Sequence, residues 1–178
     1  ALDAVMVPKV GNAADLYAID MLASQASWAT GRTKPVLLEG QIESALGLSN
    51  VNEIAGASPR LIALHFGHAD FSATIGMRTI KIGADHPDYV ALGEMDGTGV
   101  RQAFVNDPWH YPLMATITAA RARGLLVFEG PYGEIRDLEG LATYARRAAY
   151  LGCTGKWAIH PDQVDVINAA FSPAEKDV

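Results

Sequence analysis

Five short apolar runs alternate with segments of helical pattern along the chain, and this alternation limits the folds open to it. Continuous apolar runs of this length, bounded by Gly or Pro, are typical of strands buried on both faces of a sheet. The predicted strands cover residues 4–10, 36–42, 61–66, 125–128 and 156–160. Strands that alternate with helices indicate an α/β fold with a parallel sheet and right-handed crossovers.

Helix start and stop signals separate most of these runs. The predicted helices cover residues 12–29, 50–57, 111–123, 137–151 and 162–171. Asn12 and Asp137 stand at N-cap positions, and Gly124 and Gly152 stand where a helix ends. Five strands fit either an open doubly wound sheet or part of an eight-stranded barrel. A complete barrel needs about 200–250 residues, so a barrel built from this chain would lack strands.

One long segment, residues 71–107, interrupts the alternation. It shows no clear period and contains five glycines and a proline. Loops of more than about 15 residues in a compact domain are functional or disordered, and this one follows a strand end, where α/β proteins place their ligands. We interpret it as a lid or substrate-covering insert; a mobile surface insertion is the alternative.

Composition excludes several classes of function. The 14 basic residues are outnumbered by 20 acidic ones, and no stretch concentrates Lys and Arg, so neither nucleic-acid nor membrane-surface binding is expected. No apolar run approaches the length of a membrane span. Cys153 is the single cysteine, which excludes an internal disulfide and favours a cytoplasmic location. The first residues do not resemble a signal peptide, and both ends look cut.

Common catalytic motifs are absent. The glycines at 97 and 99 are followed by Gln102 where a dinucleotide fingerprint needs a third glycine, and no Gly-x-Ser-x-Gly elbow occurs. His65 and His68 are three residues apart and would point to opposite faces of a strand. We therefore do not expect them to form a metal site, and at least one should be packed or hydrogen-bonded.

Two acids stand just past the ends of consecutive predicted strands, Glu43 after the second and Asp70 after the third. Consecutive parallel strands joined by one short helix are usually neighbours, so these carboxylates should converge on one rim. Converging carboxylates are hard to ionise together unless a cation joins them, and Mg²⁺ prefers oxygen ligands with substrate and water completing its shell. The alternative is that each acid caps the helix that follows it.

Each of the other residues at this rim has a functional and a structural interpretation. Gly67 would allow main-chain N–H groups to approach a carboxylate, or would simply form a tight turn. Lys9 ends the first predicted strand and would either contact a ligand or remain solvated, and Lys156 would be a ligand contact or a solvated charge. Pro161 opens a helix with free N–H groups, and His160 before it is a functional or a structural histidine.

Taken together, these segments resemble the HpcH/HpaI aldolase and citrate lyase β-subunit family, and within it the malyl-CoA and β-methylmalyl-CoA lyases. The matching segments, in the family's order, are VMVPKV at 5–10, IESALGLSNVNEIAGASPRL at 42–61, LHFGHAD at 64–70, GPYG at 130–133 and LGCTGKWAIHPDQV at 151–164. The resemblance implies a (β/α)8 TIM barrel of the phosphoenolpyruvate/pyruvate superfamily. Residues 1–178 would be its C-terminal portion, covering about strands 4 to 8.

The resemblance also assigns roles to residues. Glu43 and Asp70 match the family's Mg²⁺ ligands, and Gly67, His68 and Ala69 match the turn that holds the 2-oxo acid carboxylate. Residues Ile159, His160 and Pro161 match the loop near the acyl-CoA. Other catalytic residues are expected in the absent N-terminal strands and in a C-terminal extension. Two positions depart from the family. Leu46 stands where the family often has Arg or Lys, and Glu129 stands where Asp is common.

The activity implied is reversible, Mg²⁺-dependent cleavage of a 3-hydroxyacyl-CoA of the malyl-CoA type to acetyl-CoA or propionyl-CoA plus glyoxylate. Citramalyl-CoA lyase, malyl-CoA thioesterase, citrate lyase β-subunit chemistry or a non-catalytic truncated barrel are the alternatives. Exposed sheet edges normally pair or aggregate, so we expect a homo-oligomer, a trimer or hexamer.

Overall fold

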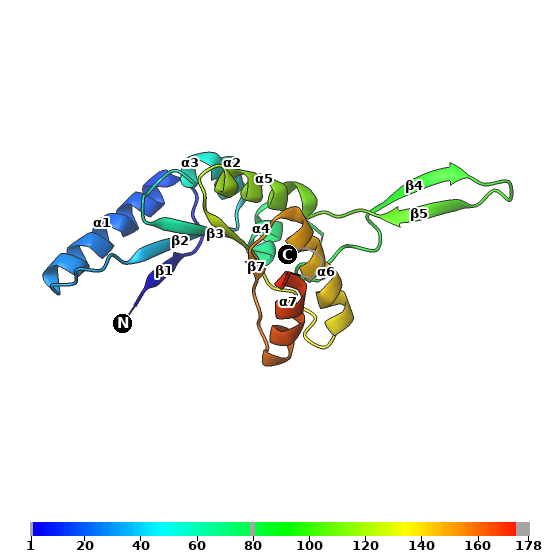
Figure 1. Cartoon of the computed structure of the whole chain (residues 1–178). Coiled ribbons are helices and arrows are strands. Elements are labelled where there is room, and N and C mark those ends of the chain that lie inside the picture. The colour runs from blue at the N-terminus through cyan, green and yellow to red at the C-terminus, as the bar shows by residue number, and fades with distance from the viewer. Residues whose placement is uncertain (1, 79–80, 174–178) are drawn as a thin grey trace.

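The computed structural model describes residues 2–78 and 81–173, and its centre is one five-stranded parallel sheet (Figure 1). The sheet order is β1-β2-β3-β6-β7, and each neighbouring pair is parallel. The strands are β1 (Ala4–Val7), β2 (Leu37–Ile42), β3 (Leu61–Phe66), β6 (Leu126–Glu129) and β7 (Gly155–Lys156). The predicted α/β class with a parallel sheet is confirmed.

Helices connect these strands and cover the apolar side of the sheet. They are α1 (Ala13–Ala29), α2 (Ala45–Ser49), α3 (Val51–Ile54), α4 (His68–Thr74), α5 (His110–Arg121), α6 (Leu138–Leu151), the 3-10 turn η1 (Pro161–Gln163) and α7 (Val164–Phe171). Leu38 and Ile42 of β2, Leu64 of β3 and Leu113 of α5 have no exposed surface. The main core therefore lies between the sheet and these helices.

Most predicted helix ends are confirmed. The Asn12 side chain accepts the N–H of Ala14 and forms a capping box with Asp15, and Asp137 accepts the N–H of Gly140. The helix predicted over 50–57 is present but shorter, as α3, and α2 precedes it. The Asn50 side chain donates to the carbonyl of Gly11 rather than capping α3.

Two predicted strands are shorter than expected, because local chemistry ends them. β1 stops at Val7: Pro8 has no N–H to donate, and Lys9 adopts a left-handed conformation with φ of 53°. β7 covers only Gly155–Lys156. Beyond it the chain turns into η1, where the N–H of Ile159 donates to the side chain of Gln163.

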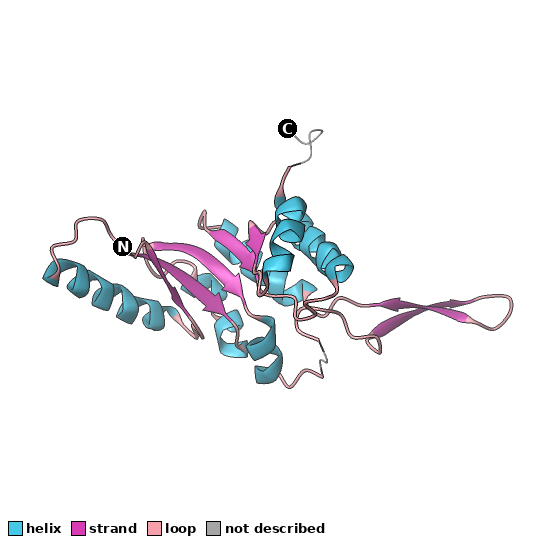
Figure 2. Cartoon of the chain, turned by 90° about the horizontal axis from the view of Figure 1, so that it is seen from below, coloured by secondary structure: helices cyan, strands magenta, loops and turns pink. Residues whose placement is uncertain are grey.

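The segment 71–107, interpreted from the sequence as a long loop forming a lid or substrate-covering insert, contains regular structure. Its first residues complete α4, and it contains an antiparallel hairpin of β4 (Val90–Met95) and β5 (Arg101–Val105). All of β5 is exposed, and the hairpin projects away from the sheet in both views (Figures 1 and 2). Apolar residues on both sides of an exposed ribbon give no alternation, so the sequence showed no period. In this arrangement the hairpin does not cover the sheet.

None of the helices in the described part of the chain combines the length and apolar character needed to cross a membrane.

Candidate functional site

The carboxyl ends of β2 and β3 place Glu43 and Asp70 around one residue, Lys9. β2 and β3 are hydrogen-bonded neighbours, with Ile42 opposite Phe66 at their ends. Glu43 is the next residue after β2, and its Oε1 accepts the main-chain N–H of Lys9 at 2.9 Å. Asp70 lies in the first turn of α4, and its carboxylate pairs with the Lys9 ammonium. The structure thus brings the two acids predicted from the sequence to one rim.

Neither acid acts as a helix cap. The Ser44 side chain caps α2 by accepting the N–H of Gly47, and no side chain caps α4. The alternative interpretation of these carboxylates as caps is therefore wrong. Both acids instead contact Lys9, Glu43 through the Lys9 main-chain N–H and Asp70 through the Lys9 ammonium.

The two carboxylates differ in environment. Glu43 is 4% exposed, and burial raises the pKa of its carboxyl; the Lys9 N–H opposes this, whereas the negative charge of Asp70 raises the pKa further. The second Glu43 oxygen, Oε2, accepts a hydrogen bond from Gln41 Nε2 at 2.7 Å. The Asp70 side chain is half exposed. A buried carboxylate whose pKa is raised by the charge of its neighbour forms, together with that neighbour, a site that a cation stabilises.

The turn between β3 and α4 leaves no room for a side chain at Gly67. An added Cβ would lie 2.7 Å from Glu43 Cβ and 3.0 Å from Gln41 Nε2. The Gly67 N–H itself donates to the carbonyl of Ile42 at 2.9 Å. Main-chain donors for a ligand are therefore those of the first residues of α4, His68 and Ala69, because a helix leaves its first N–H groups without internal partners.

The His68 side chain is directed away from the two acids. It is fully buried and contacts the rings of Phe66 and Trp109 at centroid distances of 5.0 and 4.7 Å. Burial lowers the pKa of His68, with the positive charges of Lys156 and Arg147 acting in the same direction against Glu129. Only the main chain of His68 is available to a ligand at the rim.

The residues present fit a Mg²⁺ ion. The donors are carboxylate oxygens, which Mg²⁺ prefers, and the cation now paired with Asp70 is the ammonium of an exposed lysine that can move away. Within residues 2–78 and 81–173 no group of three or more His, Cys, Asp or Glu is arranged to hold a metal. Mg²⁺ is commonly held by one or two protein carboxylates, and water and substrate oxygens fill its remaining coordination positions.

The predicted acyl-CoA loop lies on the same edge of the sheet, beyond β7. Ile159 is half exposed, and the His160 ring accepts the N–H of Asp162 at 3.2 Å. Pro161 opens η1 as predicted. These residues are accessible to a ligand, and one strand, β6, lies between β7 and β3.

The sequence reasoning missed a buried ionic cluster between β6, β7 and α6. Lys156, read as a ligand contact or a solvated charge, is buried, and its ammonium donates to Glu129 Oε2 at 2.7 Å and to the carbonyl of Gly130 at 2.8 Å. Arg147 of α6 pairs with the other Glu129 oxygen and with Asp107. Burial opposes ionisation of Glu129, but Lys156 and its other neighbours outweigh it and lower its pKa to about 2. The predicted strand 156–160 began at Lys156 and therefore placed this residue at the end of the sheet away from Glu129. The shorter β7 instead sets Lys156 directly opposite Glu129.

A second missed network lies on the face of the sheet opposite the core. Trp157 Nε1 donates to His65 Nδ1 at 2.8 Å, so the proton of His65 is on Nε2, which lies 2.8 Å from Glu39 Oε2. Burial lowers the pKa of His65 despite Glu39. Glu39 and Gln41 are two residues apart in β2 and therefore share this face. Glu43, just past the end of β2, is joined to Gln41 by a hydrogen bond. His65 is thus hydrogen-bonded, as expected for at least one of the two histidines.

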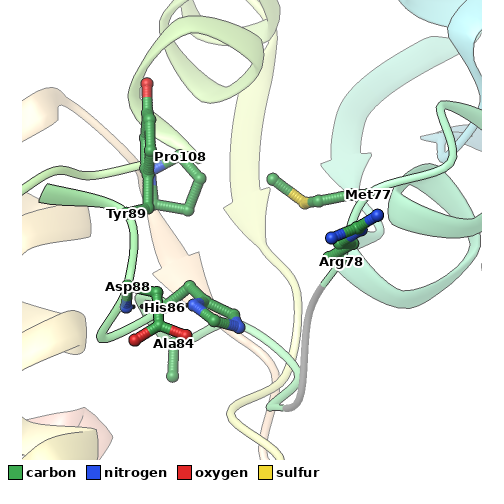
Figure 3. A pocket seen from close by; sticks show the side chains of 7 residues that line it. All are labelled: Met77, Arg78, Ala84, His86, Asp88, Tyr89 and Pro108. Carbon is green, nitrogen blue, oxygen red and sulfur yellow. Dashed lines mark hydrogen bonds between the residues drawn. The ribbon is translucent and has the colours of Figure 1, made fainter.

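A hollow of about 570 Å³ lies elsewhere, between the end of α4 and the base of the hairpin. In Figure 3, Met77 and Arg78 stand on one side of it and the other labelled residues on the opposite side. Neither Glu43 nor Asp70 lines it. The chemistry of the rim therefore does not depend on this hollow.

Comparison with known proteins identifies the family of the chain. The family model described as HpcH/HpaI aldolase/citrate lyase matches residues 1–161. An L-malyl-CoA/β-methylmalyl-CoA lyase of Cereibacter sphaeroides (strain ATCC 17025 / ATH 2.4.3) is 49% identical over 177 residues, which are 99% of this chain and 54% of the relative. The malyl-CoA/β-methylmalyl-CoA/citramalyl-CoA lyase of Chloroflexus aurantiacus is 36% identical over 99% of this chain and 51% of its own length. The chain spans about half the length of these curated relatives.

A solved structure is similar along almost the whole chain. The citrate lyase β subunit of M. tuberculosis, complexed with oxaloacetate and magnesium, superposes with a TM-score of 0.69 at 25% identity, over 97% of this chain and 63% of that one. The described α/β chain covers part of a barrel of this type, and its five parallel strands account for the predicted partial barrel. The chain belongs to the HpcH/HpaI aldolase/citrate lyase family.

Proposed function

We propose that the protein containing this chain is a Mg²⁺-dependent carbon–carbon lyase that cleaves a 3-hydroxyacyl-CoA of the malyl-CoA type to acetyl-CoA or propionyl-CoA and glyoxylate. The observation that carries the proposal is the acid pair: Glu43, held through both oxygens, faces Asp70 at adjacent strand ends. The names of the relatives, 49% and 36% identical, supply the substrate class.

Different residues of this chain would bind the metal ion, the substrate carboxylate and the acyl-CoA. Glu43 and Asp70 would hold the ion, and the N–H groups of His68 and Ala69 would bind the carboxylate that becomes part of glyoxylate. Ile159 and Pro161, exposed beyond β7, and the partly exposed His160 between them would contact the acyl-CoA. Bound Mg²⁺ supplies Lewis-acid chemistry to the substrate oxygens.

Cleavage is a retro-Claisen step. The substrate hydroxyl gives its proton to a base assigned to residues outside this chain as the carbon–carbon bond breaks and the C–O bond becomes the carbonyl of glyoxylate. The electron pair of the broken bond moves onto the thioester as an enolate, which is then protonated. The enolate needs a hydrogen-bonding or cationic partner in a site without water. Protonation of the released enolate is assigned to residues outside this chain.

The test measures acetyl-CoA and glyoxylate formed from malyl-CoA, with and without Mg²⁺, for the wild type, Glu43→Ala and Asp70→Ala. Mg²⁺-dependent turnover that both substitutions abolish supports the proposal. Malate and free CoA as products would indicate a thioesterase instead. Mg²⁺ binding that both substitutions remove, without turnover, would indicate a genuine site in a chain that is not catalytic alone.

The proposal includes self-association. β1 and β7 are the two edges of the sheet, and an unpaired sheet edge tends to pair with another chain. We propose a homo-oligomer, a trimer or hexamer. Sedimentation of a single species at the mass of the monomer, 18.9 kDa, would contradict this part.

A further inference from the structure

Lys9 makes contacts with both acids of the site through different groups. Its main-chain N–H donates to Glu43 Oε1 at 2.9 Å, and its ammonium pairs with the Asp70 carboxylate. Among the described residues it is the one residue other than glycine with a positive φ, 53°. Left-handed backbone at a bulky residue is uncommon and persists where surrounding contacts determine it.

The unusual backbone has an identifiable consequence. Pro8 cannot donate to the sheet, and the left-handed turn at Lys9 aims the next available N–H at the buried carboxylate of Glu43. The N–H of Val10 then returns to the sheet by donating to the carbonyl of Gln41. The main chain of Lys9 therefore fixes the orientation of Glu43, whatever its side chain does.

The side chain has a separate task because of the charge at the rim. Two carboxylates and one ammonium sum to −2 + 1 = −1, and a divalent cation changes the sum to +1. One carboxylate of a 2-oxo acid would neutralise that remaining charge. The Lys9 side chain is 65% exposed, so it can leave Asp70 without disturbing the core.

We propose that Lys9 is a positioning and cation-exchange residue of this site. Its N–H orients Glu43, its ammonium balances Asp70 when no divalent cation is bound, and the same ammonium pairs with the carboxylate of a 2-oxo acid once Mg²⁺ occupies the acids. This inference rests on the proposed Mg²⁺ site and adds a residue to it.

The test uses calorimetric titration of Lys9→Met, which keeps the length of the side chain and removes its charge. Without ligand, Mg²⁺ should bind about two- to fivefold more tightly than to the wild type, the range set by losing one exposed competing ion pair. At saturating Mg²⁺, glyoxylate should bind about tenfold more weakly, because a charge-assisted contact is lost. A structural defect would weaken the binding of both Mg²⁺ and glyoxylate. Tighter Mg²⁺ binding together with weaker glyoxylate binding therefore identifies the exchange.

Two variants complete the design. Lys9→Arg keeps the charge and should restore wild-type behaviour in both titrations. Lys34→Met removes a comparable exposed ammonium, the partner of Asp3, and should change neither. If wild type and Lys9→Met bind Mg²⁺ equally, the Lys9 role is overturned while the metal site stands. If neither the wild type nor Lys9→Met binds Mg²⁺, the metal site of the proposed function is refuted as well. If Lys9→Met binds Mg²⁺ and the wild type does not, the exchange is supported.

Discussion

The absence of a side chain at Gly67 is what lets the Glu43 carboxylate lie beside the turn after β3. An added Cβ would be 2.7 Å from Glu43 Cβ and 2.9 Å from its Oε2. The backbone of Gly67, with φ of −103° and ψ of 101°, is one that any residue adopts. Any effect of a substitution there is therefore steric and falls on Glu43.

Gly67→Ala should therefore displace Glu43 and weaken Mg²⁺ binding by about tenfold or more, as loss of ligand orientation does in other metal sites. The free energy of unfolding should fall by about 1–3 kcal/mol from overpacking. Calorimetry and urea unfolding measure the two effects. Gly97→Ala is the matched control, since no heavy atom lies within 4 Å of an added Cβ. Unchanged Mg²⁺ affinity in Gly67→Ala would show that the close approach of residue 67 to Glu43 does not control metal binding.

Lys156→Met should strongly destabilise the fold. The substitution leaves the fully buried Glu129 without the ammonium that now lies 2.7 Å from it. Breaking a buried pair on one side costs about 3–5 kcal/mol, because one charge stays buried with too few partners. Urea unfolding measures this, with Lys34→Met as the exposed control. Equal, small effects of the two substitutions would show that Glu129 is satisfied without Lys156.

Glu129 should also make stability depend on pH in the acid range. Its pKa is lowered from 4.5 to about 2 in the folded chain. The unfolded state therefore binds the proton first, so this stabilisation is complete above about pH 4.5 and is lost as the pH falls toward 2. The difference in unfolding free energy between wild type and Glu129→Gln should shrink between pH 5 and about pH 2.5. A constant difference over that range would refute this assignment.

Cys153 should be unreactive in the folded protein. Burial raises the pKa of its thiol to about 12, with the Glu129 charge adding to the shift. The thiolate is the reactive form, so labelling by a disulfide reagent at pH 8 should be slow in buffer and stoichiometric in urea. Because it is the single cysteine, labelling reports opening of this site alone. Rapid labelling under native conditions would mean that α6 separates readily from the sheet.

Removal of the β4–β5 hairpin should leave the rest of the fold intact. The N–H of Asn106 donates to the carbonyl of Tyr89 at 2.8 Å, so the hairpin starts and ends at one point and two glycines can replace residues 90–105. The hairpin buries almost no surface, so cooperative unfolding should persist with little change in free energy. Loss of the transition would show that the hairpin supports the sheet.

The sequence determined the elements whose signals are local. The five strands follow from apolar runs, the start of α1 from Asn12 and Asp15, and the end of α6 from Gly152, because caps and buried strands depend on nearby residues. Convergence of Glu43 and Asp70 also followed from the sequence, since adjacent parallel strands end at one edge. The hairpin escaped prediction because an exposed ribbon need not alternate apolar and polar residues.

Only the tertiary structure decided which charges are buried and where they point. Glu129, Arg147 and Lys156 belong to three different elements and meet because β6, β7 and α6 pack together. The His68 ring turns into that interior while its main chain stays at the rim. Lys9 reaches both acids through a left-handed turn that no periodicity reveals. Burial and the direction of a side chain depend on contacts between distant segments, and those contacts exist only once the chain has folded.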